Sequence, residues 1–248
     1  MRKCIVSGTI FFVGLFIPAA RSMAQMSETD SLVYKVAVGD AITSYHDFLG
    51  SNASLYNGIE YVAYPLAINE GHPFFLFDRF DTATVIYDGV LYHQVRLLFD
   101  LAQDVLVVEP PFQGSVIQLY NERIKSFTLF GHNFVRIVDD SARRESIATG
   151  FYEVLYSGKS LLLRKDNKDI EQNLVYDGMQ IFIREKINYY LLRDGSYHPI
   201  NNKKELLNLM SDRKKEIRQF LRKNKIRLRK DMDDALVRAV AFYDRLPR

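Results

Sequence analysis

The chain has almost no cysteine and no tryptophan, and Cys4 is the single cysteine among its 248 residues. Cys4 lies ahead of an apolar run, whereas the lipid-modified cysteine of a bacterial lipoprotein follows one. It also lies in a segment expected to be removed on export, so the mature chain has no thiol. A disulfide framework, a cysteine nucleophile and a cysteine-ligated metal are therefore excluded.

The chain also lacks a hydrophobic run of the roughly 20 residues that a transmembrane helix needs. Its longest apolar run, Ile5–Ile17, has 13 residues and follows the basic start MRK. Ser22 and Ala24 then occupy the small-residue positions of a cleavage site before Gln25. We interpret residues 1–24 as a secretory signal peptide, with an uncleaved membrane anchor as the alternative. The protein is thus expected to be exported, to the periplasm or the extracellular space.

The mature chain has no excess charge of either sign. The full chain has 33 Lys and Arg against 30 Asp and Glu, and residues 1–24 hold three basic residues and no acid. The charge is nevertheless divided unequally. Residues 201–248, the tail, carry 15 basic and 7 acidic side chains, whereas residues 25–200, the body, carry 15 and 23. We therefore expect a basic helical tail that packs on an acidic body, which partly compensates its charge.

The densest basic cluster, DRKKEIRQFLRKNKIRLRKD at residues 212–231, raises the question of a nucleic-acid-binding helix. Its spacing would place Ile217, Phe220 and Leu221 on one helical face, which predicts that this face docks on the body while the cations face solvent. An exported chain with an acidic body is not expected to bind nucleic acid. Weak contact of the 212–231 cluster with an anionic membrane surface stays open as an alternative.

Motifs of catalysis and metal binding are absent as well. There is no GxSxG nucleophile elbow, no GxxxxGK[ST] phosphate loop and no GxGxxG. No pair of histidines has the HxH or HExxH spacing that would place two imidazoles on one metal. We therefore assign no catalytic, cofactor-binding or metal-binding residue and expect no cofactor, although a site assembled from distant strands stays open. The histidines are His46, His72, His93, His132 and His198.

Paired carboxylates are the remaining route to an enzyme, because two of them at a suitable distance can hydrolyse a glycoside. Turn positions explain two of the three adjacent pairs, and the first turn of a helix explains the third. The pairs are Asp78 with Asp81, Asp139 with Asp140, and Asp233 with Asp234. Whether the protein is an enzyme is left undecided, with a non-catalytic protein favoured. The triplet NAS at Asn52 matches an N-glycosylation site, a pattern that often occurs by chance.

Aromatic residues are abundant, with 15 Tyr and 17 Phe, and between residues 56 and 200 they alternate with polar ones. Turn-forming dipeptides punctuate this stretch and predict hairpins. They are Asn57-Gly58, Asp88-Gly89, Ser157-Gly158, Asp177-Gly178 and Asp194-Gly195. No fixed repeat is seen. Strands are expected near 59–64, 74–77, 83–88, 90–99, 104–109, 114–120, 123–130, 133–138, 150–156, 159–165, 173–177, 179–185 and 188–193.

Helices are expected mainly in the tail. Asn202 with Glu205 forms a capping box, a second helix is expected from Ser211 to about Asn224, and Asp231 is the expected cap of a third. The sequence thus predicts a mainly β fold, an antiparallel meander curled into a barrel, half-barrel or sandwich, with two or three C-terminal helices. A short helix or strand between residues 27 and 49 is also possible.

Several stretches resemble a pattern found in uncharacterised exported proteins of gram-negative bacteria. These are YNGIEYVAY from Tyr56, the following HPFF, VIYDGVLYHQVRLLFDLAQDVLVV, GFYEVLYSGKSLLLRK and RKKEIRQFLRKNK. The resemblance covers residues 56–246. It implies a β-rich secreted protein with a helical tail, and it transfers no activity and no functional residue.

These observations favour a non-catalytic binding or scaffolding protein of the bacterial envelope, whose partner is an unknown envelope protein. A periplasmic carrier of a lipid or another hydrophobic ligand is the first alternative, since Tyr-rich curled sheets can expose an open mouth. A carboxylate-dependent hydrolase is the second. The abundant Tyr and Phe can equally well fill a thick core.

Overall fold

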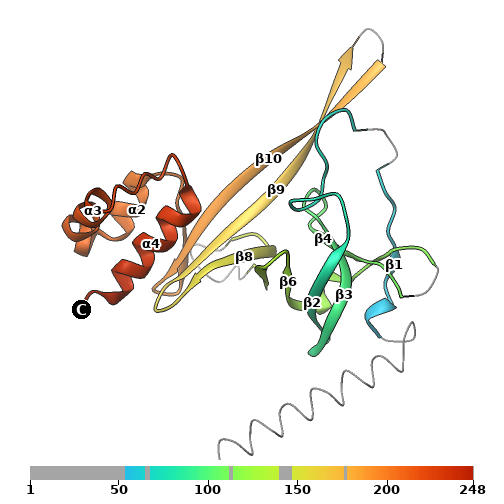
Figure 1. Ribbon diagram of the computed structural model, residues 1–248, viewed down its shortest axis with the longest axis horizontal. Helices are drawn as coiled ribbons and strands as arrows, with labels where there is room; N and C mark the ends of the chain where they lie inside the picture. Colours follow the sequence, from blue (N-terminus) through green and yellow to red (C-terminus); the bar gives the residue numbers. More distant parts are fainter. Residues whose placement is uncertain (1–53, 65–67, 112–113, 140–146, 176–177, 248) are drawn as a thin grey trace, which may run out of the picture. The chain divides into compact units, whose positions relative to one another are not determined.

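The computed structural model describes residues 54–64, 68–111, 114–139, 147–175 and 178–247. The predicted signal peptide, the possible element at residues 27–49 and the Asn52 triplet lie outside these residues. Within the described part, eleven strands form one antiparallel sheet in the order β1-β5-β4-β3-β2-β6-β7-β8-β9-β10-β11 (Figure 1). The strands are β1 (Ile59–Glu60), β2 (Asp81–Tyr87), β3 (Val90–Asp100), β4 (Val105–Val108), β5 (Ile117–Gln118), β6 (Ile124–Leu129), β7 (His132–Ile137), β8 (Gly150–Ser157), β9 (Leu161–Val175), β10 (Gly178–Arg193) and β11 (Ser196–Pro199).

The predicted mainly β, antiparallel fold is confirmed, and the strand order narrows its form. β1 and β11 lie at the two ends of the order, so the sheet is open and does not close into a barrel. All eleven strands belong to this one sheet, which does not divide into the two layers of a sandwich. A curled open sheet, the half-barrel of the prediction, is the form that fits.

Two of the predicted hairpin turns have the expected geometry. Asp88 and Gly89 join β2 to β3 with φ angles of 50° and 78°, and Asp194 and Gly195 join β10 to β11 with 51° and 80°. Positive φ at both central residues is the signature of a type I′ turn, whose twist matches that of the paired strands. The turn predicted at Asp177-Gly178 lies partly outside the described residues, since only Gly178, with a φ of 133°, is described, as the first residue of β10.

Of the two other turn predictions, that at Asn57-Gly58 is wrong, while the hairpin predicted at Ser157-Gly158 is present, as β8 paired with β9, with a different turn. Asn57-Gly58 joins no two paired strands, because it leads from a short 3-10 helix, η2 (Ser54–Tyr56), into β1. The β8–β9 connection at Ser157-Gly158 does not use a positive φ at Gly158. Instead, the Gly158 N–H donates to the carbonyl of Ser160, so this hairpin has a longer connection than the dipeptide suggested.

Some strand predictions are wrong, in stretches where apolar and polar residues do not alternate. The expected strand at 74–77 is mostly bends, and the pairs of expected strands at 159–165 and 173–177, and at 179–185 and 188–193, are single strands, β9 and β10. The joining residues, DNKDIEQ at 166–172, are mostly polar. They pair with β10 over their whole length, and of these residues only Asp166 is buried.

Different clusters cover the two faces of the central strands. On β3, Val95, Leu97 and Phe99 point into one cluster, while Leu98 points into another on the opposite face. We call the first cluster the aromatic core. It contains T-shaped and stacked pairs of phenylalanine rings, and the ring centroids of the stacked Phe127 and Phe134 lie 4.6 Å apart. Its phenylalanines are Phe75, Phe99, Phe127, Phe134 and Phe151. Phenylalanine side chains therefore fill this face of the sheet.

The far parts of β9 and β10 form a two-stranded ribbon, residues 165–175 and 178–189, which extends beyond the neighbouring strands (Figure 1). β8 pairs with β9 only up to Arg164, and β11 pairs with β10 only from Tyr190 onward. Because paired residues share a face, the register places Leu174 beside Met179 on one side of the ribbon. Leu174 is 86% exposed and Met179 48%. A segment beginning at Asn69 bonds to part of the β10 edge.

The tail forms three α-helices, as predicted. They are α2 (Lys203–Leu209), α3 (Lys214–Lys223) and α4 (Met232–Arg245), and a 3-10 turn, η4 (Ser211–Arg213), leads into α3. The Asn202 side chain accepts hydrogen bonds from the N–H groups of Lys204 and Glu205, and Asp231 accepts one from Asp234. Both predicted N-caps are therefore confirmed.

The helices of the tail pack on the sheet through a second apolar cluster, the tail core. Leu162 of β9 and Leu191 of β10 join it from the sheet, and Ile217 and Leu221 join it from α3. The predicted burial is confirmed for Ile217 and Leu221, which are 0% and 1% exposed. Phe220 is only partly buried, and its ring stacks on the partly buried ring of Phe242, with the ring centroids 4.1 Å apart.

Candidate functional site

A buried group of charged residues, the ion cluster, occupies the sheet surface between the aromatic core and the tail core. The Arg164 guanidinium lies at its centre, with Nε 2.7 Å from Asp166 Oδ1 and Nη1 2.7 Å from Asp233 Oδ2. Glu153 Oε2 lies 3.8 Å from the same Nη1. Glu153 and Asp166 are 6% and 4% exposed, so their charges are largely removed from water. The pair between Arg164 and Asp233 joins the sheet to the first turn of α4.

Two further side chains complete the ion cluster. Tyr189 of β10 donates a hydrogen bond to Asp233 Oδ1 at 2.5 Å, and burial raises the Tyr189 pKa above its ordinary value. His132 Nδ1 lies 2.6 Å from Glu153 Oε1. Burial also raises the pKa of Asp166, although the Arg164 charge opposes this. A raised carboxyl pKa is found both in catalytic acids and in the carboxyls of structural ion pairs.

Whether a substrate could reach the carboxylates distinguishes a catalytic role from a structural role for the ion cluster. A hydrolase needs its carboxylates at a substrate-sized cleft, yet none of the three cavities described below is lined by a residue of this cluster. One oxygen each of Glu153 and Asp166 is buried without a hydrogen-bond partner in the described part. The geometry fits a clamp that holds the tail on the sheet.

The acidic pairs singled out in the sequence do not act as pairs. Asp233 turns inward to Arg164, while Asp234 faces the surface and bonds to Arg238 at 3.4 Å. Successive residues of a helix point about 100° apart, so adjacent carboxylates diverge. Asp81 begins β2 and accepts the N–H of Thr82, and Asp78 lies in the bends before it. The Asp139 N–H donates to Thr149, and Asp140 lies outside the described residues.

The four described histidines belong to different segments of the fold. His132 belongs to the ion cluster, and His72 stacks on Phe74, where burial lowers its pKa. His93 is exposed on β3, His198 is on β11, and His46 lies outside the described part. Within the described residues, no group of three or more His, Cys, Asp or Glu side chains could hold a metal ion.

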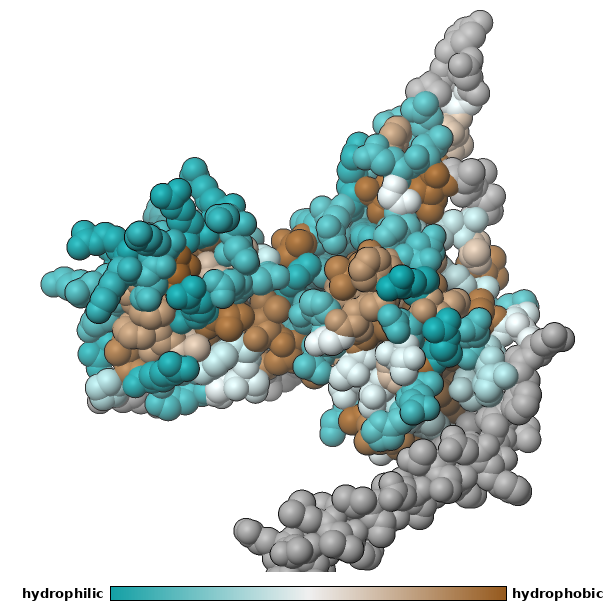
Figure 2. All heavy atoms as spheres, viewed as in Figure 1, coloured by the Kyte–Doolittle hydropathy of each residue, from teal (hydrophilic) through white to brown (hydrophobic). Residues whose placement is uncertain are grey.

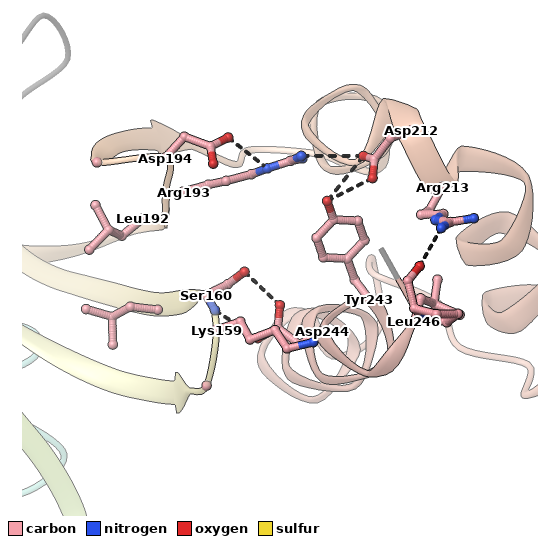
Figure 3. Close-up of a pocket in the computed structure, with 14 residues that line it drawn as sticks. Lys159, Ser160, Leu192, Arg193, Asp194, Asp212, Arg213, Tyr243, Asp244 and Leu246 are labelled. Carbon is pink, nitrogen blue, oxygen red and sulfur yellow. Dashed lines mark hydrogen bonds and ion pairs between the residues drawn. The ribbon is translucent and has the colours of Figure 1, made fainter.

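The largest described cavity, about 950 Å³, lies where two hairpin turns meet the ends of the tail helices, and we call it the junction pocket (Figure 3). The β8–β9 turn and the β10–β11 turn supply one wall, and η4 and the end of α4 supply the other. Its lining is Gly158, Lys159, Ser160, Leu161, Leu192, Arg193, Asp194, Gly195, Asp212, Arg213, Tyr243, Asp244, Leu246 and Pro247.

Most charged groups of the junction pocket are paired with one another. Arg193 lies 3.2 Å from Asp194 and 3.5 Å from Asp212, and its guanidinium also lies over the Tyr243 ring. The Tyr243 hydroxyl donates to Asp212, and burial followed by this bond raises the Tyr243 pKa. These contacts, drawn in Figure 3, fix the wall of the pocket and leave it without a free general base.

Lys159 differs from the other charged lining residues. It is exposed, and no carboxylate of the described residues pairs with it, whereas Arg213 bonds to Pro247 and to Glu216. The apolar part of the lining comes from Leu161, Leu192, Leu246 and Pro247. The pocket can therefore offer one free cation and an apolar surface to a ligand.

Two smaller cavities are described. One of about 680 Å³ lies between β11 and α2 and is lined by Ile147, Tyr190, Tyr197, His198, Pro199, Glu205, Asn208 and Leu209. The other, about 430 Å³, lies between the α3–α4 loop and the start of α4 and is lined by Asn224, Lys225, Ile226, Arg227, Lys230, Asp231, Asp234 and Arg238.

Sequence reasoning did not find the ion cluster or the junction pocket. Because their residues come from segments far apart in the sequence, no local sequence pattern predicts either site. The one available signal was a charged pair, Arg164 and Asp166, inside a strand.

Within the described residues, no helix is both long and apolar enough to cross a bilayer. Comparison of the chain with protein-family models, curated proteins and solved structures gives no significant match.

Proposed function

We propose that the protein is an exported, non-catalytic binding or scaffolding protein of the bacterial envelope, and that the junction pocket holds its ligand. The observation that carries this proposal is the pairing of the pocket's charges. Arg193, Asp212 and Asp244 are each satisfied by protein groups, which leaves Lys159 to meet a ligand. Such a lining binds without supplying a nucleophile or a base.

The chemistry of the pocket favours a small organic acid with an apolar body. About 300–1,000 Å³ is the usual volume of a small-molecule site, and the junction pocket lies at the upper end of that range. Lys159 would meet the acidic group, and Leu192 and Leu246 would contact the apolar part. This ligand class is close to the carrier alternative, in which the cargo is a lipid or another hydrophobic molecule.

The alternatives differ in what they require of the rest of the molecule. A carrier that held its cargo inside the curled sheet would need an open apolar interior, but phenylalanine rings fill that face. A hydrolase would need accessible carboxylates, but Glu153 and Asp166 of the ion cluster are buried, and the partly exposed Asp233 is held by Arg164 and Tyr189. The peripheral junction pocket is therefore the better candidate for binding.

Native mass spectrometry of the mature protein purified from its native host tests this function. We expect an additional mass on the wild-type protein that is lost in Lys159→Glu, since the change would repel an acidic ligand. Lys125→Glu, which reverses the charge of an exposed lysine on β6, is the matched control and should keep the ligand. A protein that carries no small molecule, or an adduct that survives in Lys159→Glu, would refute the assignment of the pocket.

A further inference from the structure

The acidic side chains of the tail are all engaged. Asp233 bonds to Arg164 of the sheet, Asp212 to Arg193, and Asp244 to Ser160. The other four serve the helices themselves: Glu205 and Asp231 as parts of N-caps, Glu216 with Arg213, and Asp234 with Arg238. The described ion pairs between tail and body thus join acids of the tail to cations of the body.

This pattern corrects the expectation that the acidic body compensates the basic tail. No described carboxylate lies within ion-pair distance of eight exposed cations in and after α3. We call them the basic surface: Lys215, Arg218, Arg222, Lys223, Lys225, Arg227, Arg229 and Lys230. Hydrophilic side chains gather over α3 in the space-filling view (Figure 2). The basic surface therefore presents unpaired charge of a single sign to solvent.

The 430 Å³ cavity gives this surface a concave anion site. Lys225, Arg227 and Lys230 line it, and its two carboxylates are already engaged, because Asp231 accepts the N–H of Asp234 and Asp234 bonds to Arg238. Three unpaired cations around one hollow match the charge and the oxygen acceptors of a phosphate group.

We propose that the basic surface docks on an anionic lipid bilayer, with lipid phosphates in the cavity between the α3–α4 loop and α4. The contact is electrostatic and peripheral, since the apolar side of α3 is used in the tail core and cannot insert. The eight cations span a helix and a loop, an extent that suits a surface of many head groups better than one small ligand.

A bilayer fits the surface better than a nucleic acid does. Non-specific binding of single strands uses aromatic platforms on which bases stack. The α3 aromatic, Phe220, stacks on Phe242 instead, and residues 215–230 contain no other aromatic residue.

Flotation of the mature protein with vesicles tests the proposal. We expect co-flotation with vesicles of phosphatidylcholine and phosphatidylglycerol at low salt, weaker co-flotation at moderate salt, and none with phosphatidylcholine alone. Each basic residue near an anionic surface strengthens partitioning by about fivefold. Replacing Lys225, Arg227 and Lys230 together by Gln should therefore lower the partition coefficient by about a hundredfold.

The matched control replaces three exposed cations outside the tail, Arg79, Lys125 and Lys186, by Gln and removes the same net charge. It should float like the wild type. An equal loss in the control, salt-insensitive binding, no flotation with anionic vesicles, or stronger binding to duplex DNA than to those vesicles would each overturn the proposal. A circular dichroism spectrum and a urea midpoint like those of the wild type would show that the variant has kept its fold.

Discussion

The carboxylate of Asp244, in the last turn of α4, accepts two hydrogen bonds from Ser160 in the β8–β9 turn. The Ser160 N–H donates to Oδ2 and the hydroxyl to Oδ1, both at 2.8 Å. The two residues are 8% and 5% exposed, so both bonds are formed away from water. The end of the chain is thus fixed to the sheet at a point 84 residues earlier in the sequence.

Replacing Asp244 by Ala should lower the free energy of unfolding by about 2–3 kcal/mol, because two buried donors lose a charged acceptor. Urea denaturation measures this. Asp194→Asn is the control, since that carboxylate is 83% exposed and asparagine tolerates the positive φ of this turn position, so the change should cost about 0.5 kcal/mol or less. Equal losses in the two variants would contradict the role of Asp244.

Leu221→Ala should cost about 2–5 kcal/mol, the range for a fully buried leucine. Phe220→Ala should cost less, about 1–2 kcal/mol, because its partly buried ring loses only part of the transfer free energy. A double-mutant cycle with Phe242→Ala should give a coupling of about 0.5–1.5 kcal/mol for the stacked pair. Phe220→Ala as damaging as Leu221→Ala, or no coupling, would refute this account of the tail core.

Gly89→Ala should destabilise by about 1 kcal/mol or more through the backbone alone. The φ of Gly89 is 78°, and a Cβ added there would meet nothing within 4 Å, so no clash contributes. Gly89→Asn should cost less, because asparagine tolerates the left-handed region. The two urea midpoints decide the question, and indistinguishable values would mean that the positive φ is not what the turn requires.

Stability should fall as the pH rises above about 10. Tyr61 donates to Asp100 Oδ2 at 2.8 Å, and burial, followed by that bond, raises the Tyr61 pKa far above its ordinary value. Below pH ~10 the phenol is protonated in both states; above it the unfolded chain loses the proton first, which favours unfolding by up to about 1.4 kcal/mol per pH unit. Tyr61→Phe should therefore show a shallower alkaline slope in urea titrations, and an unchanged slope would contradict the linkage.

Export remains a prediction from the sequence. N-terminal sequencing of the protein from the envelope fraction should begin at or near Gln25, because Ser22 and Ala24 suit a signal peptidase. Replacing Ala24 by a bulky residue such as Phe should block processing and leave a longer chain. Recovery of an intact chain starting at Met1 from wild-type cells would refute cleavage.

The sequence predicted best what neighbouring residues decide. Asp88-Gly89 closes its hairpin as expected, and Asn202 and Asp231 cap their helices, since each of these structures depends on residues within one turn of the chain. The strand expected near residues 90–99 is present as β3, Val90–Asp100.

What the sequence did not predict depends on distant residues. Arg164 and Asp233 are 69 residues apart, and only the docking of α4 brings them together. The junction pocket likewise needs two turns and two helix ends in one place. The polar middle of β9 was missed for a related reason: Asp169 and Glu171 lie in a strand that only its partner stabilises, so no alternation of apolar residues was required.

The ribbon of β9 and β10 implies that the molecule does not open uniformly. A two-stranded hairpin is marginal in water unless it packs on something. The ribbon is supported where Lys168 donates to the carbonyls of His72 and Phe74, and where Asn69 bonds to Ile181, but no described contact of this kind reaches Leu174 or Met179. Amide hydrogens near Leu174 and Met179 should therefore exchange with solvent deuterium quickly, and those near Leu162 and Leu191 at rates close to the global unfolding limit. Mild proteolysis should cut the chain first near Leu174 and Met179. The two fragments should then stay together through the remaining strand pairs of the sheet.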